Sequence, residues 1–62
     1  MTHPLLKHFR YAHLPEGLQA ISRPFGELAE KMDAELPHDP QKDVGMQKLL
    51  EAKDAFVRAA VK

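Results

Sequence analysis

Apolar residues recur at helical spacing in two separate stretches of the chain. In the first stretch they lie three and four positions apart, at Leu18, Ile21, Phe25, Leu28, Met32 and Leu36. This spacing predicts an amphipathic helix over 15–36, with Pro15 at its first position and Glu16 at the positive end of its dipole. Pro24 lies inside the range, so we expect a kink there or two shorter helices.

The second stretch predicts another helix over 40–61, after a turn at 37–39. Asp39 is expected to cap this helix, with Pro40 at its first position. Asp54 and Arg58 have the spacing of an ion pair on its polar side. Its apolar side is expected to carry Met46, Leu49, Leu50, Phe56, Val57 and Ala60. A turn this short makes the two helices antiparallel neighbours.

The N-terminal arm, residues 1–14, precedes this hairpin. Thr2 can cap a short helical turn over 3–10, and we expect 11–15 to be extended because the residue before a proline avoids helical geometry. The chain is therefore predicted to be all-α, a single domain over 1–62 with a short helical turn before an antiparallel αα-hairpin. Two helices give a thin core, so we expect several copies to assemble into a homo-oligomer.

Composition narrows the classes of function. The 62 residues include nine Lys and Arg, nine Asp and Glu, and no cysteine. Disulfides and cysteine-based zinc sites are excluded, and zero net charge argues against a DNA or RNA polymer as partner. No apolar run approaches the ~20 residues that cross a membrane. These features predict a soluble intracellular protein that does not contact membranes.

Cations and aromatic rings are concentrated in the first fifteen residues, which contain no acid. Lys7, Arg10, Tyr11 and His13 lie close together there. Such a combination suits a nucleotide-like ligand, because cations attract the phosphate and aromatic rings stack on the base. The competing interpretation is that Phe9 and Tyr11 are plugs that cover the hairpin.

Other residues give weaker indications of chemistry. His3, His8 and His13 are five positions apart, so they do not share a helix face and we do not interpret them as metal ligands. His3 and His8 are expected on the surface, whereas His13, next to Tyr11, is expected to make a polar contact. Lys53 lies within the apolar arc of the second helix, where it either extends its ammonium to water or contacts a phosphate at a subunit junction. No nucleophile–base pair, carboxylate dyad or glycine-rich loop is present, so neither an enzyme nor a cofactor is expected.

Four segments together resemble a known family. They are Phe9-x-Tyr11-x-His13-Leu14-Pro15, Leu18-Gln19-x-Ile21-Ser22-x-Pro24-Phe25-x-Glu27-Leu28-Ala29, Leu36-Pro37, and Lys48-Leu49-Leu50-Glu51-Ala52-Lys53-Asp54-Ala55-x-Val57-Arg58-Ala59. This order is similar to the phage hairpin-domain family of anti-CBASS sponges and Thoeris anti-defence proteins. The similarity covers nearly the whole chain.

The resemblance implies a function. Members of that family are small helical oligomers that bind the cyclic nucleotide signals of bacterial immunity in the host cytoplasm without cleaving them. The resemblance also suggests that the oligomer is a hexamer. It also implies that Tyr11 stacks on a base with His13 nearby, and that Ser22 or Arg23 faces the phosphates. Lys7, Arg10, Lys48 and Lys53 are the other cations that could contact phosphate. The ligand could be a cyclic dinucleotide, a cyclic trinucleotide or a cyclic ADP-ribose type signal. The alternative function is a helical adaptor that docks on a host or phage protein.

Overall fold

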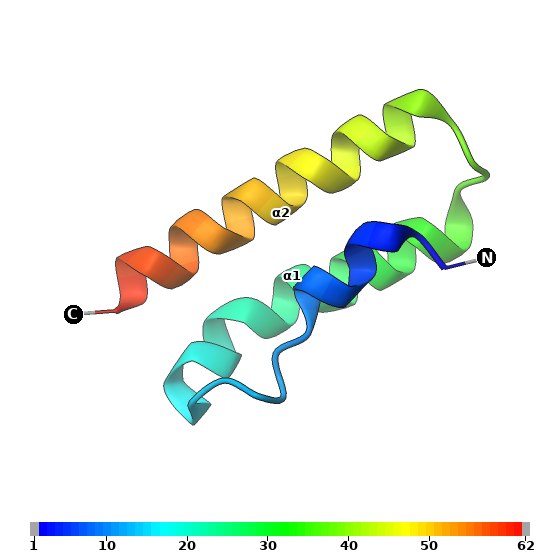
Figure 1. Cartoon of the computed structure of the whole chain (residues 1–62). Helices are drawn as coiled ribbons and strands as arrows, with labels where there is room; N and C mark the ends of the chain where they lie inside the picture. The colour runs from blue at the N-terminus through cyan, green and yellow to red at the C-terminus, as the bar shows by residue number, and fades with distance from the viewer. Residues whose placement is uncertain (1, 62) are drawn as a thin grey trace.

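The computed structural model describes residues 2–61 and contains three helical elements. They are the short 3-10 helix η1 (Pro4–Phe9), the helix α1 (Glu16–Glu35) and the helix α2 (Pro40–Ala60). No strand occurs in this part of the chain. The two long helices run antiparallel, and η1 packs against both (Figure 1). The predicted all-α hairpin is confirmed, and both long helices begin and end within one residue of their expected limits.

The connection between the long helices follows the prediction. The N–H of Leu36 donates to the carbonyl of Met32 at 3.0 Å and closes the last turn of α1. Asp39 then caps α2, because its Oδ1 accepts from the N–H of Gln41 at 2.8 Å, with Pro40 at the first helical position. Side-chain capping and proline geometry therefore set the start of α2, as expected from the sequence.

Proline does not divide α1. The helix continues from Glu16 to Glu35 through Pro24, so of the two expected outcomes, a kink or two shorter helices, the second is wrong. Pro24 has no N–H to donate to the carbonyl of Ala20, four residues earlier. Ala20 is exposed, so water can satisfy that carbonyl. The helix thus continues in spite of this missing hydrogen bond.

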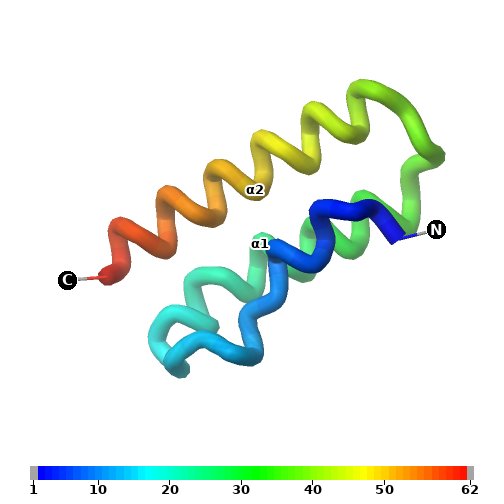
Figure 2. The backbone as a smooth tube through the Cα atoms, in the orientation of Figure 1, coloured from blue at the N-terminus to red at the C-terminus, as the bar shows by residue number. Residues whose placement is uncertain are grey.

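The N-terminal arm differs from the prediction in two respects. His3, and not Thr2, caps η1: its Nδ1 accepts from the N–H of Leu5 at 3.1 Å. The segment after η1 is a tight turn, where an extended segment was expected, since the N–H of Leu14 donates to the carbonyl of Tyr11 at 3.0 Å. The turn reverses the chain, so that the arm lies alongside α1 (Figure 2).

The arm changes which face of α1 is buried. The buried residues of this helix are Ser22, Gly26 and Ala29, all small, whereas Leu28 on the predicted apolar stripe is 43% exposed. Small side chains let the backbone of the arm approach closely, and bulky ones would hold it away. The apolar stripe thus predicted the helix correctly. It did not predict which face of the helix is buried, because the arm covers the neighbouring face that carries the small residues.

The core is small. Its buried hydrophobic residues are Phe9 of η1, Ala29 of α1 and Met46 of α2. Phe56, expected on the buried face of α2, is 56% exposed, although its ring stacks on Phe25 with centroids 5.6 Å apart. The molecule measures 37 × 18 × 14 Å, so most of its residues lie near the surface. Neither long helix has the combination of length and apolar character needed to cross a bilayer.

Candidate functional site

A groove between the N-terminal arm and α1, here named the arm groove, contains half of the predicted ligand-binding residues. Its volume is about 690 Å³, within the range of roughly 300–1,000 Å³ found for small-molecule sites. It is lined by Leu6, Lys7, Phe9, Arg10, Tyr11, Ala12, His13, Gly26 and Glu30. The arm therefore brings Lys7, Arg10, Tyr11 and His13 to one surface.

Tyr11 is placed in this groove by a close approach to α1. A Cβ atom at Gly26 would lie 2.9 Å from the carbonyl oxygen of Phe9 and 3.3 Å from Cδ1 of Tyr11. Only glycine leaves room for both groups. The Tyr11 side chain is half-buried, so part of its ring still faces outward. The glycine is thus the local reason that the ring rests against the helix.

The turn that follows Tyr11 is held by a glutamine of α1. Nε2 of Gln19 donates to the carbonyl of Leu14 at 2.7 Å and to the carbonyl of Ala12 at 3.3 Å. These bonds satisfy two carbonyls that the turn leaves without partners in the backbone. His13 lies between them in sequence and is exposed. A side chain from the first turn of α1 therefore positions the outer edge of the groove.

The groove carries cations that are available to a ligand. Lys7 and Arg10 are exposed, and neither forms an ion pair with any acid of residues 2–61. Phe9, between them, is 2% exposed and points into the core, which confirms that it is an aromatic plug. Among residues 2–61, Glu30 is the only acidic residue that lines this groove.

Three other predicted site residues lie outside the arm groove. Ser22 is completely buried, and its hydroxyl has no hydrogen-bond partner in the described chain. Arg23 is exposed and pairs with Glu27 at 3.4 Å. Lys48 is on the exposed side of α2, 3.9 Å from Glu51. In this conformation only Arg23 and Lys48 of the three are accessible to a ligand.

Lys53 has a structural partner that neither interpretation of the sequence included. Its ammonium donates to the carbonyl of His8 at 2.8 Å and pairs with Asp54 at 2.8 Å. It also lies 6.0 Å from the centre of the Phe9 ring, near enough for a weak cation–π attraction. Asp54 therefore pairs with Lys53. The pair of Asp54 with Arg58 that the helical spacing predicted is not formed. Lys53 attaches the arm to α2.

His3 is the second residue that attaches the arm to α2. The expectation that this histidine lies on the surface is wrong. It is 8% exposed. Because its Nδ1 accepts from Leu5, the ring proton lies on Nε2, which donates to Oδ1 of Asp43 at 2.7 Å. No periodicity indicated this contact, since the two residues are forty positions apart. The histidine both caps η1 and joins it to α2.

A buried ion pair completes this end of the molecule. Nζ of Lys42 lies 2.8 Å from Oδ1 of Asp33, and both side chains are at most 10% exposed. Lys42 also donates to the carbonyls of Asp33 and Leu36, and the N–H of His3 donates to Oδ2 of Asp33. The hydrogen bond from Lys42 and then that from His3 lower the pKa of Asp33, against the opposing effect of burial.

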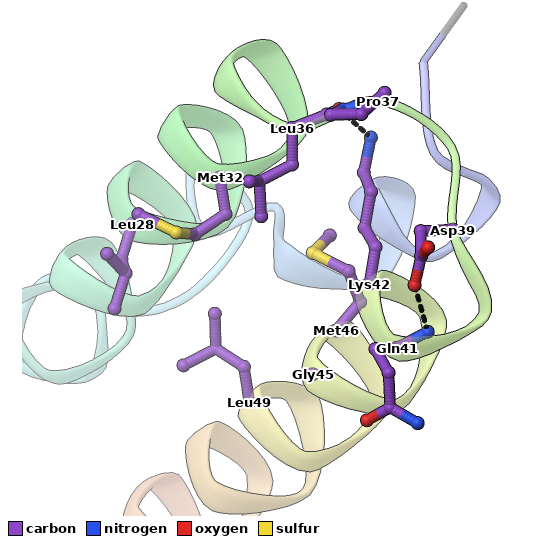
Figure 3. Close-up of a pocket in the computed structure, with 10 residues that line it drawn as sticks. All are labelled: Leu28, Met32, Leu36, Pro37, Asp39, Gln41, Lys42, Gly45, Met46 and Leu49. Carbon is purple, nitrogen blue, oxygen red and sulfur yellow. Dashed lines mark hydrogen bonds between the residues drawn. The ribbon is translucent and has the colours of Figure 1, made fainter.

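A second, apolar groove lies between the two long helices near their connection, and we name it the hairpin groove. Its volume is about 560 Å³. Leu28, Met32 and Leu36 of α1 face Met46 and Leu49 of α2 across it (Figure 3). Gly45 widens the groove, since no atom lies within 4 Å of where its Cβ would be. Its polar lining residues lie toward the turn, where Asp39 and Lys42 are hydrogen-bonded.

The arm groove presents groups that can bind an anion and a flat ring. Lysine, arginine and an exposed histidine can donate to or pair with phosphate oxygens, and a tyrosine ring can stack on a flat heterocycle. Within residues 2–61, no three His, Asp or Glu side chains are arranged to hold a metal ion. The groove thus offers charge and an aromatic surface to a ligand.

Comparisons of the chain with family models, with curated proteins and with solved structures find no match.

Proposed function

We propose that this protein binds a cyclic nucleotide signal in the arm groove and sequesters it without cleaving it. The observation that carries the proposal is that Lys7, Arg10, Tyr11 and His13 line one groove of a size suited to a small molecule. The resemblance to the phage anti-defence family supplies the biological setting. There, in the host cytoplasm, the protein would prevent the signal from activating CBASS or Thoeris effectors.

Each residue has a role that follows from its chemistry. Lys7 and Arg10 neutralise phosphate charge, and the arginine can donate two parallel hydrogen bonds to phosphate oxygens. The accessible part of the Tyr11 ring stacks on a base. His13 lies at the outer edge of the groove and contributes a further polar contact. Binding needs no rearrangement of ion pairs, because the two strong cations have no acidic partner among residues 2–61.

The proposal includes assembly into a homo-oligomer, supported by the amount of surface that one chain leaves uncovered. The accessible surface is 4617 Å², whereas compact monomers of this mass expose about 4,000 Å². The exposed surface includes large apolar side chains such as Leu28 and Phe56, which are 43% and 56% exposed. A second copy that covers these side chains would bury them from water.

A thermal-shift panel of cyclic dinucleotides, cyclic trinucleotides and cyclic ADP-ribose type compounds tests the proposal. A ligand that binds only the folded protein raises the melting temperature by mass action. The best ligand is then titrated by calorimetry into the wild type, Tyr11→Ala and Tyr11→Phe. Tyr11→Ala should lose about 1–3 kcal/mol of affinity, the range for stacking on a base, and Tyr11→Phe should keep most of it. Unchanged affinity in a folded Tyr11→Ala protein would exclude the stacking role.

The hairpin groove supports one other candidate function, a helical adaptor. Its lining of Leu28, Met32, Leu36, Met46 and Leu49 is typical of a groove that receives the apolar face of a helix. Sedimentation of the isolated protein separates the two cases. An oligomer at micromolar concentration would occupy apolar surface with further copies, as the sequestration proposal expects. A stable 7.0 kDa monomer that shows no thermal shift with any nucleotide would favour the adaptor.

A further inference from the structure

Glu30 is an uncommitted carboxylate in a groove otherwise suited to anions. It is exposed, and it forms no ion pair with residues 2–61. Three other acids of α1, Glu27, Asp33 and Glu35, each pair with a lysine or arginine. A free carboxylate repels phosphate, so a groove that served phosphate alone would gain nothing from it. Glu30 instead suits a part of the ligand that donates hydrogen bonds.

The position of Glu30 relative to Tyr11 indicates which part of a nucleotide that is. Gly26, on which the Tyr11 ring rests, and Glu30 are four residues apart and therefore lie on the same face of α1. Four residues of helix correspond to about 6 Å along its axis. Glu30 therefore lies one helical turn from the place where the ring rests and lines the same groove, so it is available to the edge of a base stacked there, and Lys7 and Arg10 are available to the phosphates.

An ionised carboxylate has two oxygens and only accepts hydrogen bonds. The Watson–Crick edge of guanine offers two adjacent donors, N1–H and the N2 amino group, which match the two oxygens. Adenine and cytosine each place a ring acceptor beside their amino group, and uracil has one donor between two acceptors. We propose that Glu30 reads this edge and makes the arm groove selective for a guanine-containing nucleotide. This inference rests on the proposed function and adds the identity of the base.

Cyclic di-GMP and cyclic di-AMP test the inference, because they differ only in the base. Calorimetric titration of the wild type should give at least about tenfold tighter binding of cyclic di-GMP, as expected for a hydrogen bond to a charged group. Glu30→Gln keeps the size of the side chain but replaces one acceptor with a donor, so the preference should fall to about threefold or less. Glu27→Gln is the matched control, since that residue is exposed on the same helix outside the groove, and it should keep the full preference.

The outcomes separate the two proposals. Equal binding of both nucleotides to the wild type, or a preference that survives in Glu30→Gln, would overturn the role of Glu30 and leave sequestration standing. A Glu30→Gln protein that binds both nucleotides more tightly by the same factor would also overturn it, because Glu30 then only competes with phosphate for Lys7. If neither nucleotide binds, and no compound in the thermal-shift panel binds, the proposed function is overturned as well.

Discussion

The ammonium of Lys53 donates to the carbonyl of His8 at 2.8 Å, across forty-five positions of sequence. This bond joins the C-terminal end of η1 to the middle of α2. The end of a short helix leaves carbonyls without backbone partners, and a cation there is favoured by the helix dipole as well as by the hydrogen bond. Lys53 therefore stabilises the position of the arm, which forms one side of the arm groove.

Removal of the Lys53 charge should loosen the arm. Lys53→Met keeps an unbranched apolar stem and should lower the free energy of unfolding by about 1.5 kcal/mol, the low end for a hydrogen bond to a charged group, because His8 is exposed. Lys48→Met is the control, since Lys48 is 74% exposed and its ion pair lies on the surface. Urea unfolding of both variants measures the difference, and equal losses would contradict the attachment role.

Two glycines in long helices should respond to alanine in opposite directions. Gly26→Ala places a Cβ 2.9 Å from the backbone of Phe9, so we expect a loss of about 1–3 kcal/mol from overpacking. Gly45→Ala meets no atom within 4 Å and should stabilise α2 by up to about 1 kcal/mol, the difference in helix propensity. Thermal or urea unfolding of both variants and the wild type measures these changes in stability. A gain in stability for Gly26→Ala would mean that the arm does not lie on this face.

Replacement of Phe9 and of Phe56 by alanine should lower the free energy of unfolding with a different dependence on protein concentration. Phe9 is 2% exposed, so Phe9→Ala should cost about 3–5 kcal/mol at any concentration. Phe56 is 56% exposed in one chain and should cost much less in dilute solution. In an oligomer that covers it, the cost of Phe56→Ala should grow with concentration. Melts over a hundredfold concentration range measure this, and an unchanging Phe56→Ala effect would count against covering by other copies.

The ion pair of Asp33 and Lys42 should make stability depend on pH in acid. The pKa of Asp33 is lowered in the folded protein, so its contribution is complete above the ordinary value of about 3.9 and is lost as the pH falls through the lower folded pKa. Asp33→Asn should therefore be less stable than the wild type at neutral pH and converge with it in strong acid. Urea unfolding from about pH 7 to pH 2 tests this, and parallel curves would exclude the linkage.

The hairpin itself could be predicted from local signals. The periodic apolar residues, Pro40 and the capping side chain of Asp39 act within one or two turns, so they give both helices nearly to their ends. The buried face of α1 could not be predicted in this way, because it is selected by an arm that follows no period. One signal was present: a glycine in the middle of a helix is unfavourable unless something needs the space, and Gly26 marks where the arm lies.

The arm groove shows a similar division. The cluster of Lys7, Arg10, Tyr11 and His13 is contiguous in sequence, and a turn is enough to keep it together. Glu30, by contrast, enters the groove only because the arm folds back along α1. The contacts of His3 and Lys53 depend on the same reversal. Such long-range contacts depend on which surfaces pack together. The local pattern of residue types along the chain does not reveal that packing.

The hydrogen bond between His8 and Lys53 also bears on the order of folding. The arm precedes both long helices, and its two distant anchors, Asp43 and Lys53, belong to α2. Local helices form before contacts between distant residues, so α1 and α2 can pair while the arm is still free. The arm is therefore expected to dock late in folding, and the arm groove is complete only after the hairpin has formed.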